Sequence, residues 1–135
     1  MKLISVLLSF ALVASLPPAH AADAMKPAMP GVGEGGAFPQ TQGADLYQAA
    51  CQACHMPEGV GATAAASYPA LAKNSRLKPK VYPITRVLNG SRAMPSFKGV
   101  LSNEQIVAVI TYVRTHFGNN YTDKISLEDV KALRQ

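Results

Sequence analysis

The 135-residue sequence has only two cysteines and three histidines, and these small numbers exclude several kinds of site. Cys51 and Cys54 are three positions apart, so a disulfide between them would close too short a loop to stabilise the fold much. A structural zinc site needs four ligands, and the histidines apart from His55 are His20 and the distant His116. A thiol redox pair usually opens a helix after a strand, and no strand pattern precedes Cys51. Disulfide, zinc and thiol redox functions are therefore disfavoured.

The sequence also lacks a long apolar run, except at its N-terminus. Residues 3–16 form this run, which follows Lys2 and ends at a Pro-Pro pair and the small-residue sequence Ala-His-Ala. That order is typical of a secretory signal peptide, so residues 1–21 are predicted to be a signal that is cleaved after Ala21. A bilayer span needs about 20 apolar residues, so no stable membrane insertion is expected. The mature chain is predicted to be periplasmic, in an oxidising compartment.

Acidic residues are absent between Glu58 and Glu104. The chain has a net charge of +5, which becomes +4 when Lys2 is removed with the signal. A basic stretch of this kind suits electrostatically steered contact with an acidic protein, although a generally basic protein would look the same. Export and the lack of an aromatic-basic platform argue against nucleic-acid binding. The basic residues in the stretch are Lys73, Arg76, Lys78, Lys80, Arg86, Arg92 and Lys98.

The two cysteines belong to the sequence Cys-Gln-Ala-Cys-His at residues 51–55. Cys-x-x-Cys-His is the attachment pattern of a c-type haem, in which Cys51 and Cys54 form thioether bonds to the haem vinyl groups. On one helical turn the two sulfurs reach opposite edges of the porphyrin, while the imidazole of His55 points at its centre as an axial iron ligand. The sequence therefore predicts one covalently bound haem c.

The second axial ligand has three candidates in the sequence. Met56 is adjacent to His55 and cannot reach around the porphyrin edge, so it is expected to be a loop residue. His116 falls in the last turn of a predicted helix and is expected on the surface. Met94 lies in the loop sequence Arg-Ala-Met-Pro-Ser-Phe, about forty residues after the attachment site. A thioether ligand opposite histidine raises the reduction potential, as in electron-carrying cytochromes, so Met94 is the predicted ligand, in preference to a gap-filling core role.

The rest of the chain predicts an all-α domain. Residues 22–42 are rich in Pro, Gly and Ala and are expected to be a flexible leader. Helices are expected near residues 44–53, 71–75 and 83–88, and no strand pattern is visible. The strongest prediction is a helix from Ser102, whose capping box includes Gln105, to Phe117, and a last short helix begins near Ser126. A buried haem would supply apolar surface that a core this small lacks.

From Gly43 to about Gly118 the sequence resembles the class I cytochromes c of the small bacterial periplasmic kind. Gly43 and Tyr47 stand eight and four places before Cys51, where the family packs its first helix against its last, and Tyr112 matches the aromatic position of that last helix. Pro69 matches the proline whose carbonyl accepts a hydrogen bond from the ligand histidine. The resemblance implies a cytochrome c domain at residues 43–118, with residues 119–135 as a C-terminal helical extension.

The resemblance further implies a one-electron carrier rather than an enzyme, because both axial positions would be filled. Its donor would be a periplasmic dehydrogenase, and its acceptor an oxidase or the respiratory chain. The alternative is a small cytochrome subunit that stays fixed within a dehydrogenase complex. A haem enzyme or gas sensor would instead need an open or labile sixth position.

Overall fold

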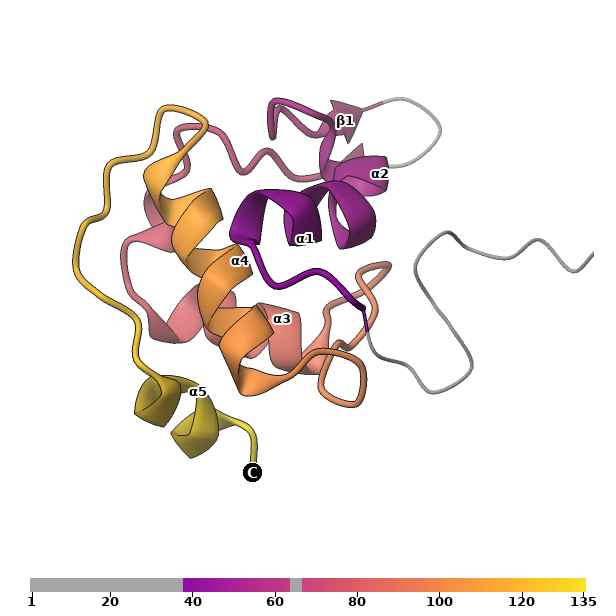
Figure 1. The fold of residues 1–135 in the computed structure, drawn as a ribbon. Helices are drawn as coiled ribbons and strands as arrows, with labels where there is room; N and C mark the ends of the chain where they lie inside the picture. The colour runs from indigo at the N-terminus through magenta and orange to yellow at the C-terminus, as the bar shows by residue number, and fades with distance from the viewer. Residues whose placement is uncertain (1–37, 64–66) are drawn as a thin grey trace, which may run out of the picture.

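The computed structural model describes residues 38–63 and 67–135 (Figure 1). The predicted signal peptide, residues 1–21, and the predicted leader as far as residue 37 lie outside the described residues. The described chain is mostly helical, which confirms the predicted fold class. Its elements are α1 (Gly43–Ala50), α2 (Gln52–His55), β1 (Ala62–Thr63), β2 (Ser67–Tyr68), the 3-10 helix η1 (Ser75–Leu77), α3 (Val81–Asn89), α4 (Asn103–Thr115) and α5 (Leu127–Leu133).

The crossing of α1 and α4 forms the centre of the fold (Figure 1). Gly43 makes this crossing close, because a Cβ atom at that position would lie 2.3 Å from the carbonyl oxygen of Ala108 and 2.7 Å from the Cβ of Tyr112. Further along α1, the ring of Tyr47 packs at centroid distances of 5.8 Å from Tyr112 and 4.8 Å from Phe117. The α1–α4 contact expected from the resemblance is thus present.

The apolar stripe predicted for the long helix is the part of α4 that faces the core. Ile106, Ile110 and Val113 are buried, and Phe117, just past the helix end, is half-buried. The predicted capping box is also present, since Gln105 N donates to Ser102 Oγ and Ser102 N donates to Gln105 Oε1. These local signals therefore predicted the helix and its start correctly.

The packed part of the chain begins before Gly43. The side-chain amide of Gln105 donates to the carbonyl oxygens of Phe38 at 2.6 Å and Gln40 at 2.8 Å, and Phe38 is buried in the core. Residues 38–42, expected to be part of a flexible leader, are therefore fixed against α4 in the structure.

The chain after α4 runs back beside that helix and ends in α5, near the N-terminal end of α4 (Figure 1). The buried guanidinium of Arg114 fixes the return segment, because it donates to the carbonyl oxygens of Leu77 and Lys78 and to both the carbonyl and the carboxylate of Asp123. A second capping box, formed by Ser126 and Asp129, begins α5 as predicted.

Two expectations about local structure were wrong. Of the helix predicted near residues 71–75 only Ser75 is helical, as the first residue of η1. Leu71 N and Ala72 N donate to Gly59 O and Lys73 N donates to Phe117 O, so these amides have tertiary partners instead of helical ones. The expectation of no strand fails at one place, where β1 and β2 pair as a short antiparallel ladder.

Candidate functional site

The attachment motif occupies one helical turn, as its spacing requires. Cys51 ends α1, and its carbonyl oxygen accepts from Cys54 N at 3.1 Å and from His55 N at 2.9 Å. Both cysteines are half-buried and free of any disulfide. Burial, together with the nearby Cys54, raises the pKa of the Cys51 thiol to about 12. The turn therefore presents two thiols and one imidazole close together in the sequence and in space.

The imidazole of His55 is buried, and its Nδ1 lies 2.9 Å from the carbonyl oxygen of Pro69. A carbonyl oxygen can only accept a hydrogen bond, so Nδ1 carries the hydrogen and Nε2 keeps its lone pair. Metal-bound histidines commonly donate their other ring nitrogen in this way. His55 is thus held in the tautomer that can bind iron through Nε2.

The segment that supplies the Pro69 carbonyl is tied to the rest of the site by backbone hydrogen bonds. Gly59 O accepts from Leu71 N at 2.7 Å and from Ala72 N at 2.9 Å. The side chain of Asn119 adds a bond from its Nδ2 to Leu71 O at 2.9 Å. Asn119 was not singled out from the sequence, because only its fold position, directly after α4, brings it to this segment.

Met56 is the C-cap residue of α2. Its φ of 66° turns the chain away from the helix, and its carbonyl oxygen accepts a 2.7 Å hydrogen bond from the hydroxyl of Tyr47. Burial, together with the neighbouring Cys51 and Tyr112, raises the pKa of Tyr47 from its ordinary 10.0 to about 12. Tyr47 therefore links α1 to the end of the attachment turn.

Met94 lies in the loop after α3, which is on the same side of α4 as α2 in the view of Figure 1. The loop makes a tight turn in which Ser91 N donates to Met94 O at 3.0 Å and Met94 N donates to Ser91 O at 2.9 Å. Gly90 makes the turn possible, because its φ is +71° and a Cβ there would lie 2.5 Å from Met94 O. The side chain of Met94 is half-buried.

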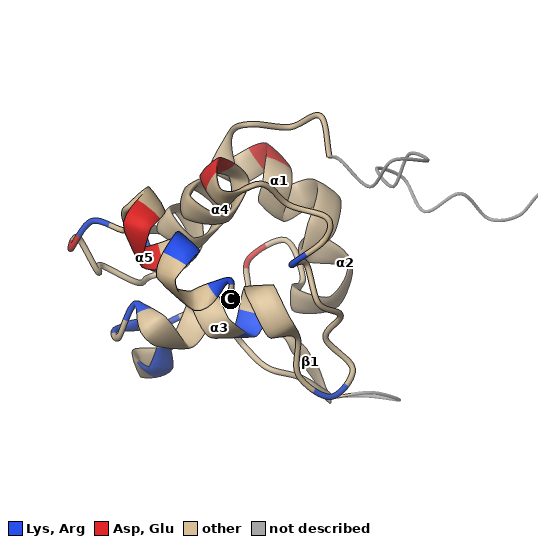
Figure 2. Cartoon of the chain, turned by 90° about the horizontal axis from the view of Figure 1, so that it is seen from below, with Lys and Arg blue, Asp and Glu red and all other residues tan. Residues whose placement is uncertain are grey.

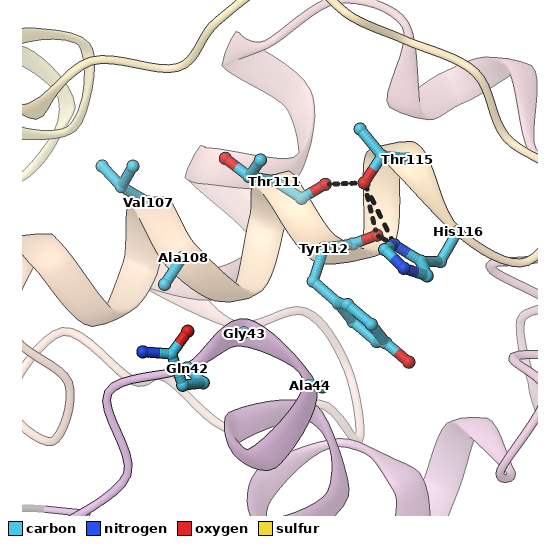
Figure 3. A pocket seen from close by; sticks show the side chains of 9 residues that line it. All are labelled: Gln42, Gly43, Ala44, Val107, Ala108, Thr111, Tyr112, Thr115 and His116. Carbon is cyan, nitrogen blue, oxygen red and sulfur yellow. Dashed lines mark hydrogen bonds between the residues drawn. The ribbon is translucent and has the colours of Figure 1, made fainter.

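His116 lies elsewhere, at the end of α4. Its ring is exposed and stacks on Tyr112 at a centroid distance of 4.1 Å, while Nδ1 lies 2.9 Å from the carbonyl oxygen of Tyr112. Both side chains line a shallow groove of about 520 Å³ between α1 and α4 (Figure 3). None of the predicted haem-binding residues lines this groove. The surface position expected for His116 is confirmed.

These donors fit a covalently attached haem c. The structure offers two free thiols on one turn, a buried imidazole with its Nε2 lone pair available, and a thioether on a separate loop. Within residues 38–63 and 67–135, no three His, Cys, Asp or Glu side chains gather as a metal-binding group. The described helices also include none that is long and apolar enough to cross a membrane.

Comparison with known proteins gives the family. Residues 38–113 match the family model described as cytochrome C oxidase, cbb3-type, subunit III. Cytochrome c6 of Leptolyngbya boryana is 39% identical over 72 residues, which cover 53% of this chain and 85% of that protein. The chain belongs to the monohaem c-type cytochromes, a family of electron carriers that hold haem c through a Cys-x-x-Cys pair, here Cys51 and Cys54.

A longer relative is also similar to this chain. The cytochrome c subunit of the quinone-dependent alcohol dehydrogenase of Gluconobacter oxydans (strain 621H) is 30% identical over 105 residues, which cover 68% of this chain. The aligned part is 22% of that protein, so the chain corresponds to about a fifth of it. Among solved structures, cytochrome c6 of the diatom Phaeodactylum tricornutum covers 67% of this chain and 92% of its own, at 28% identity and a TM-score of 0.45.

The basic stretch is only partly available for a partner. Figure 2 shows basic positions on α3 and the segments beside it, whereas α1 carries an acidic position. Lys80 Nζ lies 3.0 Å from the carboxylate of Asp129, and Lys98 Nζ donates to the main-chain oxygen of Gln135 at 2.8 Å. These two cations therefore hold the C-terminal segment. Within the described residues, five basic side chains of the stretch form neither an ion pair nor a side-chain hydrogen bond: Lys73, Arg76, Lys78, Arg86 and Arg92.

Proposed function

We propose that this protein is a periplasmic one-electron carrier in which Cys51 and Cys54 hold one haem c, and His55 and Met94 are its axial ligands. The observation that carries the proposal is the 2.9 Å contact between His55 Nδ1 and Pro69 O, because it leaves Nε2 as the one free ring nitrogen. The bound haem supplies a reversible ferric–ferrous couple. His55 and Met94 tune that couple, and together they leave no position for a substrate.

Binding of carbon monoxide tests this function. We expect the reduced wild-type protein to keep its spectrum when carbon monoxide is added at neutral pH, because His55 and Met94 occupy both axial positions. Ready binding, seen as a shifted Soret band, would instead indicate an open sixth position and a haem enzyme or gas sensor. The same sample reports the ligand pair independently, since the oxidised His/Met form has a weak near-infrared sulfur-to-iron band.

The donor is proposed to be a periplasmic, quinone-linked dehydrogenase, and the acceptor an oxidase or another respiratory-chain component. The similarity to the cytochrome subunit of an alcohol dehydrogenase supports this donor class. The same similarity equally supports the alternative, in which this protein is a cytochrome subunit that stays fixed within a dehydrogenase complex. The free cations Lys73, Lys78 and Arg92 favour the shuttle, because steered, transient contacts are electrostatic.

Salt dependence separates the shuttle from the fixed subunit. For a shuttle, reduction by the native donor should slow steeply as salt rises through about 0.15 M, where the Debye length is about 8 Å. Lys73→Glu and Lys78→Glu should slow it as well. Lys131→Glu is the matched control, because it makes the same charge change at an exposed position on α5. A rate independent of salt, or co-purification with the donor in high salt, would favour the fixed subunit.

Export is proposed to remove residues 1–21, and the mature chain is divided into a leader (22–42), a cytochrome domain (43–118) and a C-terminal extension (119–135). The order of charged, apolar and small residues at the N-terminus supports the cleavage site. N-terminal sequencing of the protein from the periplasmic fraction should begin at Ala22. An uncleaved N-terminus in the membrane fraction would contradict this localisation.

A further inference from the structure

We infer that Arg134, in the C-terminal extension, is a positioning residue for the loop that carries Met94. The inference rests on the proposed role of Met94 as an axial ligand. Arg134 is the first residue after α5, and α5 packs against both α3 and α4. The Met94 loop joins these same two helices, so α5 brings Arg134 to it.

The guanidinium of Arg134 joins the loop to α4. Its Nη2 donates to the carbonyl oxygen of Leu101 at 2.9 Å, and its Nη1 donates to the carbonyl oxygen of Lys98. Its Nε donates to Oδ1 of Asn103, the first residue of α4, at 2.6 Å. The planar fork of arginine suits this set of bonds, whereas a lysine ammonium is a single point donor that cannot reproduce it.

The other side of the same loop is fixed to the end of α3. Phe97 N donates to Val87 O at 3.0 Å, and Lys98 N donates to Leu88 O at 3.2 Å. The hydroxyl of Ser96 donates to Leu88 O as well, at 2.5 Å. The segment that begins two residues after Met94 is thus bonded to α3 through its amides and to Arg134 through its carbonyls.

This clamp, formed by Arg134 and the end of α3, matters because the loop residues next to Met94 are mostly exposed, and the loop's side-chain packing is confined to Phe97, Val100 and Leu101. Ser96, Lys98 and Gly99 are exposed, and a Cβ at Gly99 would contact nothing within 4 Å. A loop that opens more often leaves its ligand position free more often. The apparent affinity of an added ligand then rises in proportion to the open fraction. Arg134 therefore lowers the open fraction and keeps Met94 in place.

Imidazole titration of the ferric holoprotein tests the inference, because imidazole binds only where Met94 has left. We expect Arg134→Ala to raise the affinity for imidazole by about three- to tenfold, which corresponds to the net contribution of about one hydrogen bond. Arg134→Lys should keep most of this increase, since it retains the charge and loses the fork. Lys131→Ala is the matched control, because it removes a cation from exposed α5 surface and should leave the affinity unchanged.

A second variant covers the case in which Arg134→Ala does not fold with haem. Asn103→Ala removes only the α4 side of the clamp, so it should raise the imidazole affinity by a smaller factor. Denaturant unfolding of each variant separates a local effect from a global one. Wild-type affinity in Arg134→Ala, or an increase that merely follows global stability in every variant, would overturn the inference. If the wild-type protein itself lacks the near-infrared band, the Met94 assignment fails instead.

Discussion

The two proposed axial ligands are held by different parts of the molecule. His55 is buried and lies on the same helical turn as both cysteines, and a single carbonyl oxygen 14 residues away fixes its ring. Met94 is half-buried in a loop whose fixed geometry depends on α3 before it and on Arg134 at the far end of the chain. On the histidine side (residues 51–69), His55 is therefore held by contacts among the segment's own residues, whereas the methionine side (the loop of residues 90–102) also depends on Arg134, 33 positions after Leu101.

This difference has an energetic consequence. Covalent attachment makes the histidine side intramolecular, so His55 has a high effective concentration at the iron it is proposed to bind. Met94 is joined to the attachment site through about forty residues of chain, so its position at the iron depends on how well the hydrogen bonds of its loop keep that loop closed. We therefore expect changes on the histidine side to affect assembly and folding, and changes on the methionine side to affect potential and ligand exchange.

The largest effect is expected from breaking the histidine side. The double variant Cys51→Ser, Cys54→Ser should carry no covalent haem, because neither thioether can form. A core of this size then lacks the apolar surface of the cofactor, so the chain should be largely unfolded. Intact-mass measurement and far-ultraviolet circular dichroism check both points. Ala53→Ser, an exposed change in the same turn, should keep the haem and the fold. A folded, haem-loaded double variant would contradict the proposed attachment.

Breaking the methionine side should leave the protein folded and haem-loaded. Met94→Ala should remove the near-infrared band, admit carbon monoxide, and lower the reduction potential by more than the ~59 mV that marks a tenfold change in a one-electron equilibrium. Redox titration and the oxidised spectrum measure these changes. Met56→Ala is the control, since the carbonyl oxygen of Met56, rather than its side chain, makes the contact with Tyr47. If the band survives in Met94→Ala and disappears in Met56→Ala, the ligand assignment is wrong.

The same contrast explains what could be predicted from the sequence. The attachment turn and the start of α4 depend on neighbours within five residues, so the Cys-x-x-Cys-His pattern and the Ser102–Gln105 capping box were sufficient. The contact of His55 with Pro69 came from the family resemblance, because no local pattern pairs residues 14 positions apart.

What could not be predicted depends on contacts across the whole chain. The helix expected near residue 73 fails because its amides bond to Gly59 and Phe117, which local propensity does not register. Lys80 and Lys98 were expected to face a partner, but the C-terminal segment occupies them. The role of Arg134 was missed for the same reason, since nothing near it in the sequence points to the loop 33 residues earlier.

A smaller effect is expected at the α1–α4 crossing, which supports the histidine side. Gly43→Ala places a methyl group 2.3 Å from Ala108 O, so the helices must separate. Overpacking of this kind should lower the free energy of unfolding by about 1–3 kcal/mol. In Gly99→Ala, on the methionine side, the added methyl group has no atom within 4 Å. This substitution should change the free energy of unfolding by less than about 0.5 kcal/mol. Guanidinium unfolding of the two holoproteins measures the contrast, and equal effects would contradict it.

The smallest effect concerns the Tyr47 hydroxyl, which ties α1 to the end of the attachment turn. Tyr47→Phe leaves Met56 O without its donor, and this should cost about 1 kcal/mol of unfolding free energy at neutral pH. The pKa of Tyr47 is raised to about 12 in the folded protein, so the hydroxyl's stabilising contribution is fully present below pH 10 and is lost as pH rises toward 12. The difference between wild type and Tyr47→Phe should therefore narrow over that range.

Guanidinium unfolding at pH 7, 10 and 11 measures this narrowing. Tyr82→Phe is a suitable control, because it removes the hydroxyl of a half-buried tyrosine and leaves Tyr47 intact, so the loss of stability with pH that is due to Tyr47 should remain. A stability difference between wild type and Tyr47→Phe that stays constant up to pH 11 would show that Tyr47 ionises equally in the folded and unfolded chains. In that case the hydroxyl would be solvated in the folded protein, and the attachment turn would depend on its backbone bonds and on Pro69 alone.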